Sequence, residues 1–291
     1  MGPQLAPCRP HLGVVVESGR GAVEFSVRAF CGDFASISDK MNNKITLIAV
    51  AVAMGFGLVG CESSRYEPST VLPGGQPALL PPQPQLAELE LVARAAAQAP
   101  APIEGEGWRT LFDGRSLTGW QVTDFKQGGG VEVRDGLLVF FKGDNFVGVN
   151  YTNEIPKTNY EFTVEAMRVA GEDFFCGLTF PVNDSFCSLI VGGWGGGLVG
   201  LSSLDGADAS ENETTQFVTF EKGRWYRIRL RVTEQKIEAW IEQKKVVDVN
   251  IVGRKISLRF GDIERSKPFG LASYSTSAAF RGLKLRAVPV P

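Results

Sequence analysis

The titratable side chains of this 291-residue chain leave little choice of acid–base chemistry. His11 is the only histidine, so a Ser-His-Asp triad or a zinc site with several imidazoles must use it or be abandoned. Proton transfer therefore falls to carboxylates. Glu161 and Glu165 lie on one face of an expected strand, roughly 13 Å apart by strand rise. Because glycosidase carboxyl pairs lie about 5–10 Å apart, a partner must come from another strand or loop, for example Asp184 or Asp173.

A glycine-rich stretch matches a nucleotide-binding pattern without its structural context. Residues 195–200 fit GxGxxG, but the residues that follow predict a strand and a turn, whereas the nucleotide site requires the start of a helix. We therefore expect no nucleotide. The glycines are better explained as a bulged stretch that lines a cleft, with Trp194 at its rim.

No cofactor and no metal cluster are expected. The alternative is a structural calcium ion in an acidic loop, although such loops are more often simply solvated. The loop contains Asp205, Asp208, Glu211 and Glu213.

The charge balance argues against nucleic acid as a partner. Thirty basic residues stand against 32 acidic ones, which gives a formal net charge of −2. Nucleic-acid-binding domains usually carry a strongly basic footprint. We therefore expect no nucleic acid.

Short β-type runs separated by Gly, Asp and Asn fill the chain from about residue 106 onwards. Residues 160–167 alternate, with Tyr160 and Phe162 on the face expected to enter the core. Another run covers residues 256–260. About a dozen such runs and no convincing long helix predict an all-β domain, built as an antiparallel two-sheet sandwich.

One hairpin can be assigned in register. A two-residue turn at residues 234–235 places Arg231 opposite Glu238 and Arg229 opposite Trp240 on one face. One interpretation is a surface that stacks sugars on Trp240 and binds anions through Arg229. The favoured interpretation is a solvated ladder of salt bridges with one cation–π contact, each worth at most about 1 kcal/mol.

Two cysteines flank another predicted hairpin. Cys176 and Cys187 lie on either side of residues 181–184. In an exported domain they could form a cross-strand disulfide, and this is the favoured state. The alternative is a pair of buried free thiols in neighbouring strands.

The segment that starts at Met41 has the layout of a bacterial lipoprotein signal. Residues 41–44 form a short basic start, residues 45–60 form an apolar run, and Cys61 follows. A transmembrane anchor is the alternative, but 16 residues are short for a bilayer that needs about 20. We therefore expect lipidation of Cys61 and export to the cell envelope, at the outer membrane or the periplasmic face.

Composition divides the chain into four segments. The linker is rich in Pro, Gln, Ala and Ser, and a short helix could form within residues 85–98. The segments are residues 1–40, explained by a start codon assigned too early; residues 41–61, the signal peptide; residues 62–105, the linker; and residues 106–291, the folded domain.

Several segments of the folded part resemble the 3-keto-disaccharide hydrolase domain family, formerly a domain of unknown function. The most specific is the opening Leu-Phe-Asp-Gly-x-x-Leu-x-Gly-Trp, and the likeness extends over about residues 107–288. The resemblance implies a concanavalin-like (LamG-like) jelly roll, often exported, linked to cleavage of glycosides oxidised at sugar carbon 3. The matching segments are residues 107–120, 133–138, 160–165, 223–228, 270–274 and 280–285.

The resemblance also implies a mechanism. A ketone at sugar carbon 3 acidifies the neighbouring C–H bond, so a carboxylate can remove that proton and expel the glycosidic oxygen. Glu165 occupies the position of the family's strand glutamate and is the best candidate for the base, with Asp184 as a possible helper. Candidates for substrate binding are Glu161, Trp194, Arg229 and Trp240.

The chain also departs from the family pattern. A family Asn-Ser-Gly-Ile segment that ends in arginine corresponds to residues 175–178 and ends here at Pro181, and a Tyr-Glu-x-Gln strand corresponds to residues 186–189, which lack the acid and the amide. Two functions therefore remain open. The first is an envelope-anchored hydrolase or lyase for modified sugars, and the second is a non-catalytic sandwich that binds carbohydrate or another surface partner through Trp194 and Trp240.

Overall fold

The computed structural model describes residues 85–126 and 128–289, and every structural statement below concerns these residues. The expected signal peptide and Cys61 lie outside them. Lipid anchoring therefore stays a prediction, which mass spectrometry of the mature N-terminus checks. Within the described residues, no helix is long and apolar enough to cross a membrane.

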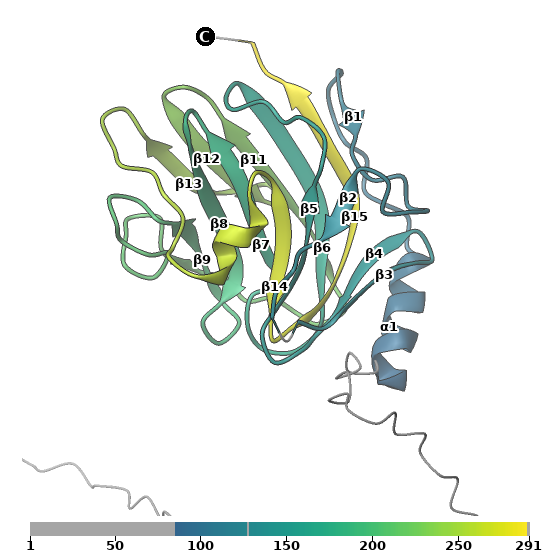
Figure 1. The fold of residues 1–291 in the computed structure, drawn as a ribbon. Helices are drawn as coiled ribbons and strands as arrows, with labels where there is room; N and C mark the ends of the chain where they lie inside the picture. Colours follow the sequence, from purple (N-terminus) through teal and green to yellow (C-terminus); the bar gives the residue numbers. More distant parts are fainter. Residues whose placement is uncertain (1–84, 127, 290–291) are drawn as a thin grey trace, which may run out of the picture. The chain divides into compact units, whose positions relative to one another are not determined.

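Two antiparallel sheets form the domain, as the strand patterns predict (Figure 1). The first sheet has eight strands, with β1 (Arg109–Thr110) paired to β15 beside the main order. That order is β13 (Lys244–Asn250), β12 (Lys236–Ile241), β11 (Trp225–Val232), β6 (Tyr160–Ala170), β15 (Ser277–Ala287), β4 (Leu137–Phe141) and β3 (Gly130–Arg134).

The second sheet has seven strands and completes the sandwich. A 3₁₀ helix, η1 (Asp262–Ser266), lies between β13 and β14 in the chain. The strand order is β10 (Gln216–Phe217), β9 (Leu198–Ser202), β8 (Ser185–Gly193), β7 (Cys176–Val182), β14 (Gly270–Tyr274), β5 (Phe146–Tyr151) and β2 (Trp120–Val122).

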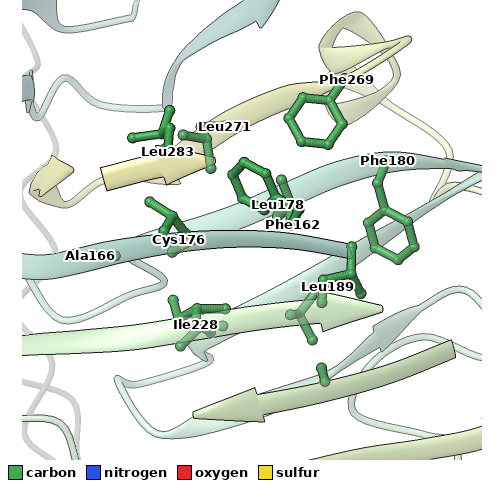
Figure 2. Close-up of a cluster of buried hydrophobic side chains, with 14 of the residues drawn as sticks. Phe162, Ala166, Cys176, Leu178, Phe180, Leu189, Ile228, Phe269, Leu271 and Leu283 are labelled. Carbon is green, nitrogen blue, oxygen red and sulfur yellow. The ribbon is translucent and has the colours of Figure 1, made fainter. Parts of the chain in front are cut away.

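The main core lies between the two sheets. Strand β6 directs its even-numbered residues inward, and Tyr160 and Phe162 are completely buried there, as expected. Figure 2 shows Phe162 near Leu178, from β7 of the opposite sheet, and near Phe269, which directly precedes β14. The Tyr160 hydroxyl donates to the Pro181 carbonyl oxygen at 2.7 Å, so the buried phenol is satisfied across the core.

The β11–β12 hairpin has the register predicted from the sequence. Arg229 pairs with Trp240 and Arg231 pairs with Glu238. Burial alternates along β11, because its inward residues enter the core and its arginines remain half-exposed. The Arg229 guanidinium lies 4.0 Å from the centre of the Trp240 ring, which is the expected cation–π contact.

The predicted disulfide between Cys176 and Cys187 is wrong. Both cysteines are free and buried. Cys176 pairs with Val191 and Cys187 pairs with Phe180 in the β7–β8 ladder. The two thiols therefore lie four residues apart along the strands, roughly 13 Å, whereas a disulfide joins directly neighbouring positions.

Because these two thiols are buried, we expect the protein to lose stability at high pH. Burial raises the pKa of Cys176 and of Cys187 from 9.0 to about 12. The stability that the buried thiols contribute is therefore complete below pH 9 and is lost as the pH rises towards 12. Between these values the thiols ionise in the unfolded chain but stay protonated in the folded protein. At pH 10 each thiol lowers the free energy of unfolding by about 1 kcal/mol. Urea unfolding at pH 8 and pH 10 measures this loss.

The double variant Cys176→Ala/Cys187→Ala is the control, since it keeps every other group that titrates in this range. Its unfolding free energy should fall less between pH 8 and pH 10 than that of the wild type. Equal losses in both proteins would contradict the burial of the thiols.

A helix before the first strand packs on the outward face of the eight-stranded sheet. Helix α1 (Leu86–Ala96) buries Val92 and Ala95 against Phe141 of β4 and Met167 of β6, and Figure 1 shows it beside β3 and β4. Residues 97–103 then cross the same face, and we call them the strap. The packed structure thus begins within the predicted linker, before residue 106.

Candidate functional site

A pocket opens on the outward face of the seven-stranded sheet. Its cavity volume is about 380 Å³, within the usual range for small-ligand sites. Alternate residues of β8 face opposite sides of the sheet. Cys187 and Leu189 point into the core, whereas Ser188 and Ile190 point outward and line the pocket. The lining comprises Asn145, Phe146, Asp173, Phe174, Ser188, Ile190, Trp194, Ser202, Arg259, Phe260, Asp262, Ile263 and Tyr274.

Aromatic rings form one wall of the pocket and part of its rim. The Tyr274 ring lies 5.0 Å from the Phe146 ring and 6.0 Å from the Phe174 ring, measured between centroids. At the rim, Trp194 is 41% exposed and Phe260 is 94% exposed. Such large exposed rings next to a cavity indicate a surface available for a ligand.

The Trp194 side chain stands on a tight turn between β8 and β9. Trp194 has a positive φ of 45°, a conformation that non-glycine residues rarely adopt. The Asp173 carboxylate holds the turn, because its Oδ1 accepts the backbone N–H of Trp194 at 3.2 Å and that of Phe174 at 2.7 Å. Strand β9 follows the glycines, so they do not begin a helix, as the sequence indicates.

Two carboxylates line the pocket, and they differ in their hydrogen-bond partners. One oxygen of Asp173 is occupied by backbone N–H groups. Asp262 begins η1, its side chain is 39% exposed, and its nearest cation is the Arg265 Nε at 3.5 Å. Arg259 pairs with Asp208 at 2.7 Å. Each carboxylate therefore keeps one oxygen without a partner among the described residues, and of the two only Asp262 accepts no backbone N–H.

Glu165 lies on the other side of the sandwich, on the outward face of β6. Its Oε2 accepts the Arg281 Nε at 2.6 Å, and its Oε1 accepts the Ala101 backbone N–H at 3.0 Å and the Arg227 Nη2 at 3.4 Å. The strap and the two guanidinium groups leave the side chain 8% exposed. Glu165 therefore joins the sheet to the strap and does not line the aromatic pocket.

The other predicted site residues are dispersed. Glu161 is fully buried beneath arginines, with the Arg286 Nε at 2.7 Å and the Arg229 Nε at 3.5 Å. This ladder also contains Trp240, which is only 9% exposed. Asp184 lies in the turn between β7 and β8, with its side chain 98% exposed and 3.3 Å from Lys157. Of the predicted residues, Trp194 and Asp173 line the pocket.

In the acidic loop, Arg254 occupies the position between two of the acids. It donates to Asp205 and to Glu213. These bonds lower the pKa of the Glu213 carboxyl, and they lower that of Asp205 after the larger contribution of the Lys255 backbone N–H. Asp208 accepts the Ser202 hydroxyl and pairs with Arg259. Three of the four acids, Asp205, Asp208 and Glu213, thus have an arginine from outside the loop as a partner.

Sequence reasoning did not identify the loop side of the pocket. Residues 256–260 have a strand pattern, yet apart from a bridge at Ile256 they form a loop that brings Arg259 and Phe260 to the rim. Asp262 follows directly. The useful signal was the Phe-Gly-Asp sequence at 260–262, because glycine between polar and aromatic residues is typical of a turn.

Comparisons with known proteins identify a family and several solved structures of low similarity. The profile of the 3-keto-alpha-glucoside-1,2-lyase-like domain family matches residues 107–286. A proposed glycosyl hydrolase from Parabacteroides distasonis has 12% identity and a TM-score of 0.41, with 63% of this chain and 94% of that chain covered. The carbohydrate-binding module CBM66 from Bacillus subtilis has 11% identity and a TM-score of 0.39, covering 58% and 96%.

A third solved structure, the Crh5 transglycosylase, has 11% identity and a TM-score of 0.43, with 62% of this chain and 84% of that chain covered. No curated protein matches the chain.

Proposed function

Since the chain belongs to the 3-keto-alpha-glucoside-1,2-lyase-like domain family, we propose that it binds a glycoside in the aromatic pocket and cleaves it by elimination. The observation that carries the proposal is that exposed aromatic rings and two carboxylates line the same pocket. Rings offer flat apolar surfaces to the C–H faces of a sugar, and carboxylates can accept its hydroxyl groups or take a proton.

The proposed reaction needs a base. A ketone at sugar carbon 3 acidifies the C–H bond at carbon 2. When a carboxylate takes that proton, the electron pair of the C–H bond forms the C1=C2 double bond and the C1–O bond to the leaving group breaks. The leaving oxygen then takes up a proton, so no oxidant or reductant is consumed.

Each pocket residue has its own role in the proposed reaction. Asp262 is the proposed base, because its oxygens have only the distant Arg265 as a cationic partner among the described residues. Trp194 and Phe260 hold the sugar at the rim. Asp173 keeps the Trp194 turn in place through its backbone hydrogen bonds.

A second candidate function is carbohydrate binding without turnover. It is favoured by the part of the lining that β8 contributes, Ser188 and Ile190, which supplies no acid. The Ser188 hydroxyl is already bonded to the Thr179 hydroxyl, outside the lining, at 2.9 Å.

Binding to the pocket is tested by Trp194→Ala. We expect the dissociation constant for a 3-keto-glucoside to rise about five- to thirtyfold, because one stacked aromatic contributes about 1–2 kcal/mol. Titration calorimetry measures the constant, and ultraviolet absorbance follows the enone product.

Phe217→Ala is the matched control. Phe217 is also an exposed aromatic, at 74%, but it lies on β10 and does not line the pocket. An equal effect of the two variants, or no effect of Trp194→Ala, would place the ligand elsewhere.

A further inference from the structure

We propose that Arg168, a buried residue outside the pocket lining, is the positioning residue that sets the pocket rim through the turn at residues 192–196, here the Trp194 turn. The inference rests on the proposed function only in taking the pocket as a ligand site. Arg168 follows the inward residues of β6, so its side chain enters the sandwich at the end of the strand.

The contacts of Arg168 converge on the two segments that carry Trp194 and Asp173. Its Nη2 donates to the Gly196 carbonyl at 2.8 Å, to the Gly192 carbonyl at 2.9 Å and, more weakly, to the Asp173 carbonyl at 3.3 Å. The two closer bonds bracket Trp194 on either side. One guanidinium therefore ties both ends of the turn to the segment that holds its middle.

The burial of this charge indicates a specific role. Arg168 is 3% exposed, and within the described residues it forms no ion pair with a carboxylate. Removing a charge from water costs several kcal/mol unless good contacts compensate. Here the compensation comes from carbonyl dipoles of the turn and from the rings of Phe175 and Phe220, whose centroids lie 5.1 and 5.9 Å from the guanidinium carbon.

The backbone of the Trp194 turn adopts positive φ angles, which need hydrogen bonds from neighbouring groups to hold them. Gly192, Gly195 and Gly196 have φ of +81°, +84° and +104°, and Trp194 joins them at +45°. A tryptophan in this region is strained. Its conformation persists because Arg168 fixes the flanking carbonyls while Asp173 fixes the Trp194 N–H.

Space around Arg168 is equally restricted. A Cβ added at Gly192 would lie 2.5 Å from the Arg168 Nη2 and 2.8 Å from the Phe175 ring. Contacts this short force the guanidinium or the turn to move. Gly192 thus provides a second way to disturb the same contact without changing the arginine.

The test uses Arg168→Lys, which keeps the charge but is shorter and lacks the planar guanidinium that carries Nη2 to the three carbonyls. The full chain is labelled with 5-fluorotryptophan, and the resonance absent from Trp194→Phe identifies Trp194 in the ¹⁹F spectrum. We expect the Trp194 resonance to shift or broaden in Arg168→Lys. The affinity for a 3-keto-glucoside should fall at least about tenfold, equivalent to about 1.4 kcal/mol.

Arg281→Lys is the matched arginine control. Arg281 also donates to backbone carbonyls, of Gln98 and Ala99, and stacks on Trp225 with its guanidinium carbon 4.2 Å from the ring centre. It lies on the opposite side of the sandwich. Its variant should therefore disturb the Trp225 resonance and leave that of Trp194 in place.

Gly192→Ala and Gly206→Ala form the second matched pair. Both glycines have similar φ, +81° and +85°, but a Cβ at Gly206 meets nothing within 4 Å. Both variants carry the same backbone strain, and only Gly192→Ala should move the Trp194 resonance.

An unchanged Trp194 resonance in folded Arg168→Lys and Gly192→Ala, checked by thermal unfolding, would overturn the inference. If the resonance moves but the wild type binds no glycoside, the positioning role holds and the proposed function fails. If the resonance moves and the affinity for the glycoside is unchanged, the role of Arg168 at the ligand site is refuted.

Discussion

Replacing Asp262 by asparagine is expected to lower the turnover of a 3-keto-glucoside by about two to four orders of magnitude, the usual loss for a missing general base. Asparagine keeps the size of the side chain but cannot accept the proton from carbon 2. Because the proposed base acts on the reacting atom, while the proposed binding contacts come from Trp194, the loss should fall on kcat and leave KM within a few-fold. Initial rates from enone absorbance measure both.

Two further carboxylate variants make this experiment decisive. Asp184→Asn is the control, because that side chain is 98% exposed in a turn outside the pocket lining. Glu165→Gln tests the base expected from the family resemblance. If Glu165→Gln abolishes turnover while Asp262→Asn retains it, the reaction occurs beneath the strap and the aromatic pocket has another role.

The second large effect is on stability. Arg281→Met should lower the free energy of unfolding by about 3 kcal/mol, the lower end of the cost of breaking a buried pair, because Glu165 keeps the Ala101 N–H and the Arg227 guanidinium as partners. The Arg281 and Glu165 side chains are 9% and 8% exposed, and their atoms lie 2.6 Å apart. Arg281 also donates to the Gln98 and Ala99 carbonyls, so the strap loses its main attachment. Urea unfolding followed by circular dichroism measures the loss.

The double variant Glu165→Leu/Arg281→Met separates a broken pair from lost packing. Removing both charges leaves neither member of the pair as an unpaired buried ion, so the double variant should recover the part of the stability that Arg281→Met loses through the broken pair. The part that comes from the Arg281 hydrogen bonds to the strap stays lost. A single variant that costs less than about 1 kcal/mol would mean that the pair behaves as an exposed salt bridge.

Local patterns predicted the strands and one hairpin in detail. Alternation at residues 160–167 identified the buried face of β6, and a two-residue turn was enough to align Arg229 with Trp240. Both depend on neighbours in sequence and on the twofold period of a strand. The two-sheet sandwich followed because one buried face in each strand needs a second sheet to cover it.

The site could not be predicted in the same way, since it depends on contacts between distant segments. The sequence placed Glu165 on an outward face of β6 but not the strap that covers it, because Ala101 is 64 residues away in the chain. The same holds for the thiols, where flanking one hairpin did not make Cys176 and Cys187 direct neighbours. Asp262 was missed because its loop has the composition of a strand.

The route by which the chain enters the domain determines how the protein can be attached to a support. Helix α1 and the strap lie on the outward face of the eight-stranded sheet, whereas the pocket opens on the outward face of the seven-stranded sheet. A sensor surface or bead coupled ahead of α1 therefore approaches the sandwich from the side away from the pocket. Coupling there leaves the rim formed by Trp194 and Phe260 accessible to dissolved sugars, and coupling through the loop at 254–262 would block it.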